Sequence, residues 1–235
     1  MIVQAEPTRQ PHIARLQSAR YREQIGGVQI TAHLDLTLSA GDLVFVQVDR
    51  SRLLTLLGDA CCGLVLPVLG ESQFIGRAWA SQPPEDAAAM RARIGRAGPD
   101  SSWVPLMSVA ENVVLAQMHH TRRPIDELLE QARELADAME LPGLPLGLPS
   151  EVGHTDLNRA GIVRAFMGQP RLIVLERPAA GDSALVPLLL DRVLSALDRG
   201  AAVLWVDEKL PEPFGVVADS RRFRLRRSGQ LEPLR

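Results

Sequence analysis

Three short apolar runs constrain the fold of this chain more than any other feature of its sequence. They are residues 43–48 (LVFVQV), 172–175 (LIVL) and 201–206 (AAVLWV). A segment with leucines at helical spacing, residues 51–62, follows the first run, and residues 184–199 form a second such segment between the other two runs. Apolar strands that alternate with helices are typical of a parallel sheet buried on both faces. The sequence therefore predicts an α/β fold.

The composition fits such a fold and limits the classes of partner. The chain has 235 residues, of which 46% are hydrophobic, enough for one α/β domain or for a domain with a small subdomain. Aromatic residues make up only 4% and the formal net charge is −2, so neither base stacking nor a general basic bias indicates a nucleic acid partner. The basic residues are nearly all arginine, and Lys209 is the only lysine in the sequence.

Further strands are predicted toward both ends of the chain. Residues 27–48 alternate between polar and apolar before they become apolar throughout, which predicts two or three strands, with Ala40-Gly41-Asp42 as a hairpin turn. Residues 70–76 predict a short strand between glycines, and residues 223–234 (FRLRRSGQLEPL) predict a C-terminal hairpin.

The middle of the chain is rich in helix signals. Ser108 and Glu111 have the spacing of a capping box in front of an apolar stretch. Residues 124–140 begin with a proline and early acids and carry leucines at helical spacing. Residues 85–96 and 156–168 also predict helices. We therefore expect mostly helices between the first apolar run and the last two.

This distribution predicts how a single domain over residues 1–235 is divided. The segments with apolar strands, about residues 25–92 and 166–235, form the core. The helix-rich segment, about residues 93–165, has no such strands and is expected to be a separate helical lobe.

Neither a metal site nor a membrane span is expected. Cys61 and Cys62 are adjacent in an apolar run, and neighbouring residues rarely meet disulfide geometry, so two buried thiols of a reducing compartment are expected. No histidine or acid stands at ligand spacing from them. The N-terminal stretch lacks a continuous apolar segment, and the longest apolar run, residues 60–69, is far short of the roughly 20 residues that a spanning helix needs. We expect a cytosolic protein that docks on a membrane protein.

The order of these elements resembles the nucleotide-binding subunit of ABC transporters over about residues 25–232. The stretches that carry the resemblance are residues 40–48 (AGDLVFVQV), 67–76 (PVLGESQFIG), 93–95 (RIG), 106–113 (LMSVAENV) and 157–182 (LNRAGIVRAFMGQPRLIVLERPAAGD). The last is the most specific, because it runs in register from the signature motif into the Walker B strand. The resemblance implies an ABC-type nucleotide-binding domain: a P-loop NTPase-like core with a parallel sheet, N-terminal antiparallel strands and a helical subdomain.

One branch of the family is closer than the others. Residues 111–124 (ENVVLAQMHHTRRP) and 148–151 (LPSE) resemble the ATPase of Mla-type systems. These ATPases pair with a permease and an MCE-domain protein to move phospholipids between bacterial membranes. The resemblance therefore implies lipid transport.

The phosphate loop of the family has the pattern G-x-x-x-x-G-K-[ST], whose glycines aim N–H groups at phosphate and whose lysine reaches the β/γ-phosphates. The matching stretch here is residues 48–55 (VDRSRLLT), with leucine at the lysine position. Only the hydroxyl survives, as Thr55, and residues 42–57 contain no glycine. Arg50, Ser51, Arg52 and Thr55 are the candidates for any remaining nucleotide binding at this turn.

The other motifs of the nucleotide site depart from the family as well. The glutamine-loop position falls at Pro99, and the signature reads VGHTD at residues 152–156. The Walker B Asp-Glu pair is Glu176-Arg177, which keeps a carboxylate at the metal position but replaces the base with a guanidinium. The switch-histidine position falls near Glu208 or Lys209. Tyr21 is a few residues too early for the adenine-stacking aromatic, so that position stays undecided.

Together these departures predict a degenerate, non-hydrolysing subunit that acts as a structural or regulatory partner of a permease in Mla/MCE-type lipid transport. A second ATP-binding subunit and an MCE-domain protein are the other partners that the resemblance implies, at the inner face of the cytoplasmic membrane. Trp103, Val104, Pro105 and Leu106 follow the lost glutamine loop and are candidates for the permease interface. No catalytic residue and no metal ligand is assigned; ATP and Mg²⁺ are cofactors implied by the family alone.

Two alternatives stay open at this point. In one, the subunit still binds or slowly hydrolyses ATP, with Arg50 or Arg52 in place of the lysine, although arginine differs from lysine in geometry. In the other, residues 181–183 (GDS) are the nucleophile block of an esterase, but no histidine follows residue 154 to act as the base.

Overall fold

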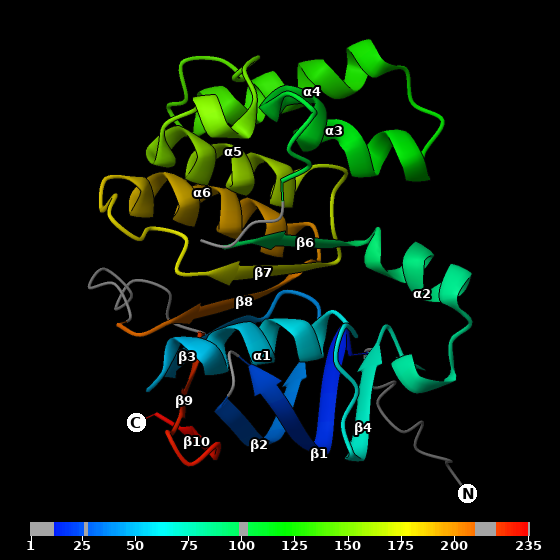
Figure 1. The fold of residues 1–235 in the computed structure, drawn as a ribbon. Helices are drawn as coiled ribbons and strands as arrows, with labels where there is room; N and C mark the ends of the chain where they lie inside the picture. The colour runs from blue at the N-terminus through cyan, green and yellow to red at the C-terminus, as the bar shows by residue number, and fades with distance from the viewer. Residues whose placement is uncertain (1–11, 26–27, 99–102, 210–219, 235) are drawn as a thin grey trace, which may run out of the picture.

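The computed structural model describes residues 12–25, 28–98, 103–209 and 220–234. Among these residues the strands form two sheets, stacked in layers with helices (Figure 1). The larger sheet has six strands in the order β10-β9-β3-β8-β7-β6 and the smaller has four in the order β2-β1-β4-β5. The α/β fold class predicted from the sequence is confirmed.

The three apolar runs form the centre of the six-stranded sheet. They are β3 (Leu43–Val48), β7 (Leu172–Glu176) and β8 (Ala202–Asp207), and β8 pairs in parallel with both of the others. Nearly every residue of these strands is buried, which is the expected result of helices or a second sheet on each face. The helix α1 (Ser51–Cys61) covers one face, and α5 (His154–Phe166) and α6 (Leu185–Asp198) cover the other (Figure 1).

Shorter strands complete the sheet at both edges. At one edge, β9 (Arg221–Leu225) pairs in parallel with β3, and β10 (Leu231–Pro233) pairs antiparallel with β9 as the predicted C-terminal hairpin. At the other edge, β6 (Ile94–Ala97) pairs in parallel with β7. The expected helical lobe of residues 93–165 therefore begins with a strand of the core, and the helix predicted for residues 85–96 ends early, as α2 (Pro84–Arg91).

The antiparallel sheet differs from the prediction in one connection and one strand. It consists of β1 (Ala14–Ile25), β2 (Val28–Leu38), β4 (Leu69–Phe74) and β5 (Arg77–Ala78). The prediction of a hairpin at Ala40-Gly41-Asp42 is wrong, because β2 pairs with β1 and the chain crosses to the other sheet at this turn. The β1 strand was not predicted. A bulge between Leu16 and Ala19, with Ser18 at φ 45°, breaks its alternation of buried and exposed residues.

The remaining helices lie beyond the α5–α6 face of the sheet. They are α3 (Val109–His120) and α4 (Ile125–Ala138), with the short 3₁₀ helix η2 (Pro149–Glu151) just before α5. The capping box predicted from Ser108 and Glu111 is present at the start of α3. A second short 3₁₀ helix, η1 (Trp79–Ser81), precedes α2. In the part of the chain that the structure describes, none of the helices has the length and apolarity needed to cross a membrane.

Candidate functional site

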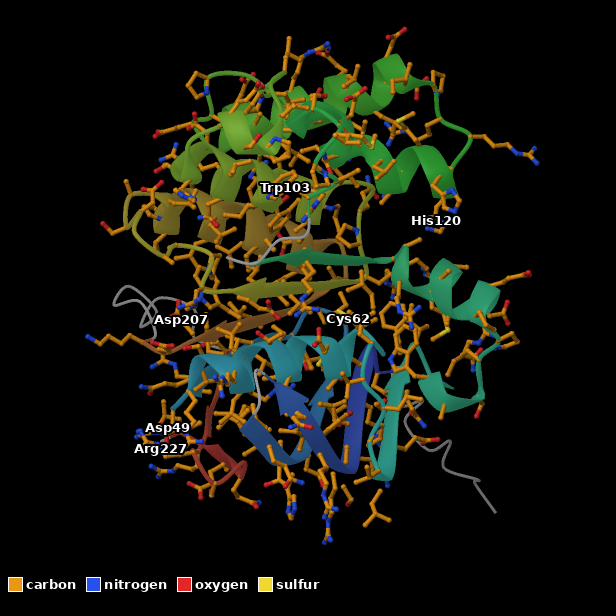
Figure 2. The ribbon with its side chains drawn as sticks, in the orientation of Figure 1. Asp49, Cys62, Trp103, His120, Asp207 and Arg227 are labelled. Atoms are coloured by element: carbon orange, nitrogen blue, oxygen red, sulfur yellow. The ribbon has the colours of Figure 1, made fainter. Side chains whose placement is uncertain are left out.

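The turn between β3 and α1 is closed by Asp49, which points back to the C-terminal hairpin (Figure 2). Its carboxylate accepts hydrogen bonds from Arg224 Nε at 2.9 Å and from the backbone N–H of Arg227 at 3.1 Å. Its own N–H donates to the carbonyl of Leu225. The Arg224 hydrogen bond holds the pKa of the Asp49 carboxyl below its usual range. Asp49 is therefore a charged anchor of the turn.

Polar groups of the next residues are also held by neighbours. Ser51 Oγ donates to Glu208 Oε1 at 2.6 Å, and Gln47 Nε2 donates to the Glu208 carbonyl at 3.1 Å. Glu208 is one of the two positions predicted for the switch histidine, so that position does contact the start of α1. The turn after β8 is fixed by Asp207, whose carboxylate accepts the N–H of Glu208 at 2.7 Å; burial raises the pKa of this carboxyl.

The nucleotide-binding candidates at this turn differ in their surroundings. Ser51 is held by Glu208, whereas the two arginines are exposed. Arg50 and Arg52 are exposed, and no hydrogen bond or ion pair of their side chains occurs among the described residues. Arg50 is the N-cap of α1 in extended conformation, without a side-chain cap. Leu54, at the lysine position, is buried with Leu53, while Thr55 is half-buried one turn into the helix. Tyr21, whose role as a stacking residue was undecided, is also buried in the core.

Glu176, at the end of β7, is buried and paired with an arginine from the neighbouring strand. Arg96 of β6 donates from Nη2 to Glu176 Oε1 at 2.7 Å and from Nε to the same oxygen at 3.1 Å. Arg96 Nη1 also donates to Asp59 Oδ1 of α1 at 2.6 Å. These three residues, the Asp59–Arg96–Glu176 network, join α1, β6 and β7 beneath the first helix.

The network depends on close packing and fixed charge. A Cβ on Gly58 of α1 would lie 1.9 Å from Glu176 Oε1, so only glycine leaves room for the carboxylate. Burial of the guanidinium would lower the pKa of Arg96, but the neighbouring Glu176 carboxylate, with Asp59, more than offsets this and raises it. Arg96 therefore stays protonated, and its positive charge balances the buried carboxylate.

The segment at the signature position forms the exposed start of α5. Gly153 is the N-cap, without a side-chain cap, and His154 and Thr155 are exposed. One turn further on, Arg159 is held by Asp182 at 2.8 Å and donates to the carbonyls of Met139 and Glu140 at 2.7 and 2.9 Å. This arginine ties the start of α5 to the end of α4 and to the loop after β7.

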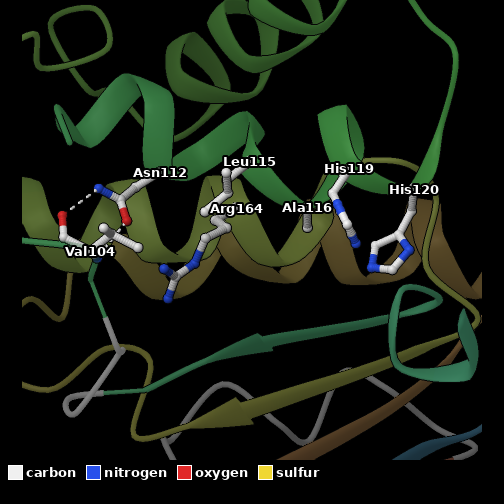
Figure 3. A pocket seen from close by; sticks show the side chains of 7 residues that line it. All are labelled: Val104, Asn112, Leu115, Ala116, His119, His120 and Arg164. Atoms are coloured by element: carbon white, nitrogen blue, oxygen red, sulfur yellow. Dashed lines mark hydrogen bonds between the residues drawn. The ribbon is translucent and has the colours of Figure 1, made fainter. Parts of the chain in front are cut away.

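A groove of about 440 Å³ runs along α3, and Val104 is the one permease-interface candidate that lines it. Its side chains form a row from Val104 at one end to His119 and His120 at the other (Figure 3). Asn112 fixes the near end, because its side chain exchanges hydrogen bonds with the Val104 N–H at 2.7 Å and carbonyl at 3.1 Å. At the far end, burial and then the neighbouring His119 lower the pKa of His120.

The four candidates take different positions around this groove. Val104 lines it directly. Trp103 lies beneath the guanidinium of Arg164, which also lines the groove, with 4.4 Å between the guanidinium carbon and the ring centroid. Pro105 and Leu106 do not line it, but both are exposed beside it, and Leu106 is 90% exposed. Pro99, the glutamine-loop position, lies outside the described residues.

Asp59, Arg96 and Arg224 were not found from the sequence. Arg96 falls in a segment that the sequence assigned to a helix, and Arg224 is one of several arginines in a predicted hairpin. The one available signal was Asp59, a lone carboxylate in an otherwise apolar stretch of α1. In the described part of the chain, no group of three His, Cys, Asp or Glu side chains is arranged to hold a metal ion.

Comparison with known proteins gives both sequence relatives and structural neighbours. The lipoprotein-releasing system ATP-binding protein LolD of Nitratidesulfovibrio vulgaris is 30% identical over 171 residues, covering 71% of this chain and 71% of that protein. The intermembrane phospholipid transport system ATP-binding protein MlaF of Escherichia coli K12 is 24% identical over 190 residues, covering 78% and 69%. No protein-family model matches the chain.

Solved structures share the fold at low sequence identity. The dimeric structure of a bacterial ABC transporter cassette matches with a TM-score of 0.79 at 21% identity, over 94% of this chain and 99% of that one. A nucleotide-free cassette from an ABC transporter matches with a TM-score of 0.68 at 18% identity, over 94% and 89%.

Proposed function

The chain belongs to the ATP-binding subunits of ABC transporters, as the sequence predicted, and we propose that it serves there as a non-hydrolysing structural subunit of a phospholipid-transport complex. Subunits of this family pair with transmembrane permeases and dimerise. In this proposal the chain holds a permease at the inner face of the cytoplasmic membrane without turning over ATP itself. The MlaF match and the MlaF-like stretches at residues 111–124 and 148–151 support the lipid-transport branch, with an MCE-domain protein in the same complex.

The observation that carries the proposal is the Asp59–Arg96–Glu176 network. The family places a carboxylate at position 176 to hold Mg²⁺ through water, and a magnesium ion needs carboxylate and water oxygens around it. Here the Glu176 carboxylate is buried, with Arg96 2.7 Å from Oε1, and Gly58 packs closely against the same oxygen while Gly98 lies against Oε2. A protonated guanidinium supplies the positive charge that the ion supplies in an active subunit. Mg²⁺ therefore does not fit this carboxylate unless Arg96 is displaced.

The β3–α1 turn also lacks the groups that a triphosphate needs. A phosphate loop presents successive backbone N–H groups around the anion, which requires backbone conformations that glycine adopts easily. This turn has no glycine, and its first position carries the Asp49 carboxylate, which would repel phosphate. The lysine position is a buried leucine. Residues 48–55 therefore do not fit a nucleotide phosphate chain, and Leu53 and Leu54 stabilise the core instead.

The groove along α3 supports the structural role. Val104, Leu115 and Ala116 line it with apolar side chains, and Leu106, two residues after Val104 in the chain, is exposed. Exposed leucines beside an apolar groove are typical of a surface that a partner covers. We assign this groove and the turn of residues 103–106 to a cytoplasmic helix of the permease.

Two measurements on the tagged chain test this function. Purified alone, the chain is expected to release no phosphate from ATP and Mg²⁺ above the blank. Purified from membranes in mild detergent, it is expected to bring down a permease whether or not ATP is present. Phosphate release that Arg52→Ala abolishes would contradict the proposal and would favour the alternative in which Arg52 replaces the lysine.

A further inference from the structure

The longest apolar run of the sequence ends on the surface of the molecule, between the end of α1 and the start of β4 (Figure 1). Ten large hydrophobic side chains are exposed among the described residues, and four of them lie within residues 64–69, here called the apolar segment. They are Leu64, Leu66, Val68 and Leu69, which are exposed by 56%, 48%, 62% and 59%. Single exposed leucines are ordinary, but a contiguous group of this kind marks a surface that something else covers.

The apolar segment is held in place at both ends by hydrogen bonds. At its start, Arg91 of α2 donates from Nη2 to the carbonyl of Gly63 at 2.8 Å. At its end, the N–H of Val68 donates to the carbonyl of Arg20 at 2.7 Å. Between them, Val65 is half-buried against the core. The exposed apolar side chains are therefore presented by a fixed backbone.

Two exposed arginines of β1, Arg20 and Arg22, lie beside the end of the apolar segment. Arg20 pairs with Leu69 across β1 and β4, and directly paired side chains lie on the same face of a sheet. Arg22 is two residues further along β1, so it lies on that face as well. Apolar and basic side chains are therefore adjacent on one surface.

Neither arginine has an acidic partner in the part of the chain that the structure describes. No ion pair of Arg20 or Arg22 occurs there. The exposed acids of the two neighbouring strands have other partners, since Asp35 of β2 accepts from the N–H of Ser18 at 3.1 Å and Glu71 of β4 accepts from the side chain of Gln73. Both guanidiniums are therefore available to an anion outside the chain.

We propose that the apolar segment, together with Arg20 and Arg22, rests on the surface of a membrane that contains anionic phospholipids. Such a surface offers phosphate directly above apolar acyl chains. The exposed leucines then enter the boundary of the acyl chains, while the two guanidiniums bind headgroup phosphate. This contact goes beyond the proposed function, because it requires neither the permease nor any particular state of the nucleotide site.

The two parts of this surface respond differently to salt. Each arginine close to an anionic membrane raises the affinity about fivefold, and this contribution is screened as the salt concentration increases. The contribution of apolar side chains that enter the membrane is not screened in this way. Binding is therefore expected to be tightest on anionic vesicles at low salt and to fall at high salt to a remainder that depends on the leucines.

Co-sedimentation of the purified full chain with lipid vesicles, without permease or ATP, tests the contact. One set of vesicles is phosphatidylcholine alone, and the other contains about 30% phosphatidylglycerol. Both are used at about 50 mM and about 500 mM NaCl. At low salt the wild type is expected to bind the anionic vesicles about tenfold more tightly, or more, than the phosphatidylcholine vesicles.

Two variants separate the contributions. Arg20→Gln with Arg22→Gln should lower the affinity for the anionic vesicles to that for phosphatidylcholine, and should remove the dependence on salt. Leu66→Ser, Val68→Ser and Leu69→Ser together should lower the affinity for the anionic vesicles about tenfold or more, and should leave only binding that high salt abolishes.

Matched controls carry the same changes elsewhere on the surface. Arg122→Gln with Arg199→Gln removes two exposed arginines, one after α3 and one at the end of α6. Met118→Ser, Ile125→Ser and Leu194→Ser together remove three exposed apolar side chains of α3, α4 and α6. Both controls should bind vesicles as the wild type does. Circular dichroism of every variant confirms that it is folded.

The outcomes distinguish this inference from the proposed function. A wild type that sediments with neither kind of vesicle overturns the inference alone, and so does a serine variant of the apolar segment that binds as the wild type does. If the wild type binds no vesicles and this serine variant no longer brings down the permease from detergent, a protein covers the segment and the inference is wrong. Vesicle binding as expected, together with release of phosphate from ATP, contradicts the proposed function alone.

Discussion

Arg96 Nη2 lies 2.7 Å from Glu176 Oε1, so a strand at the edge of the sheet supplies the positive charge for the carboxylate at the Walker B position. Arg96 is on β6 and Glu176 is the last residue of β7. The two strands are parallel neighbours, in which Arg96 pairs with Val174 and Ala97 pairs with Leu175. This relationship ties the identity of residue 96 to the loss of a metal role that we propose for residue 176, and it can be tested by mutation.

Removing Arg96 should destabilise the fold. In Arg96→Ala the buried Glu176 carboxylate loses its charge partner, and breaking a buried pair from one side costs about 3 kcal/mol or more of unfolding free energy. Urea unfolding of the two proteins measures this difference. The double variant Arg96→Ala with Glu176→Gln should recover part of the loss, because no uncompensated charge remains. A single variant within about 0.5 kcal/mol of the wild type would show that the pair contributes little.

Gly58→Ala should lower the stability of the fold, because the added methyl group has no room. The added Cβ would lie 1.9 Å from Glu176 Oε1 and 2.9 Å from Arg96 Nη2, so the Asp59–Arg96–Glu176 network must shift. Overpacking of this kind costs about 1–3 kcal/mol in a tightly packed site. The matched control is Gly153→Ala, whose Cβ would meet nothing within 4 Å. Thermal unfolding should separate the two variants; equal melting temperatures would contradict the packing described for Gly58.

Acidic pH should lower the unfolding free energy of the wild type, because it protonates Asp49. Its folded pKa is lowered, mainly by the Arg224 hydrogen bond, so its contribution to stability is complete above the unfolded aspartate pKa of about 3.9. That contribution is lost as the pH falls through the lower folded pKa. Asp49→Asn should therefore be less stable than the wild type at neutral pH, with a difference that shrinks toward acid. Urea unfolding at neutral and acidic pH measures it, and a difference that is independent of pH would contradict the assignment.

The sequence predicts the strands of this fold that are buried on both faces of the sheet, and it misses the short strand at the edge. The strands β3, β7 and β8 were predicted because nearly all of their residues are apolar. The strand β6 was not, because it has only four residues, including Gly95 and Arg96. Gly95 is required by the helix α5, since a Cβ there would lie 1.7 Å from the Ala165 carbonyl oxygen. Such a contact between distant segments leaves no periodic signal.

The candidate site shows the same limit. Position 176 and the turn of residues 48–55 were found by resemblance, but the partner of Glu176 is 80 residues away along the chain. Only the pairing of β6 with β7 places Arg96 there. Arg224 likewise reaches Asp49 because β9 pairs with β3, which the hairpin pattern alone did not reveal.

The assignment of Leu106 to the permease interface predicts that its substitution weakens assembly with the permease and leaves the fold intact. Leu106→Ser should reduce the amount of permease that co-purifies with the tagged chain, because this 90% exposed leucine has no role in the core. Leu194→Ser, a control on α6 at 44% exposure, should leave the amount unchanged. Both variants should unfold at the wild-type temperature. Equal recovery of permease with the two variants would exclude Leu106 from the interface.

We propose that the groups around residues 48–55 and Glu176 no longer bind nucleotide, and isothermal titration of the wild-type chain with ATP and Mg²⁺ measures this binding. We expect no saturable heat up to about 1 mM ATP, the range of weak nonspecific association. Saturable binding with a micromolar Kd, abolished by Arg52→Ala, would contradict it.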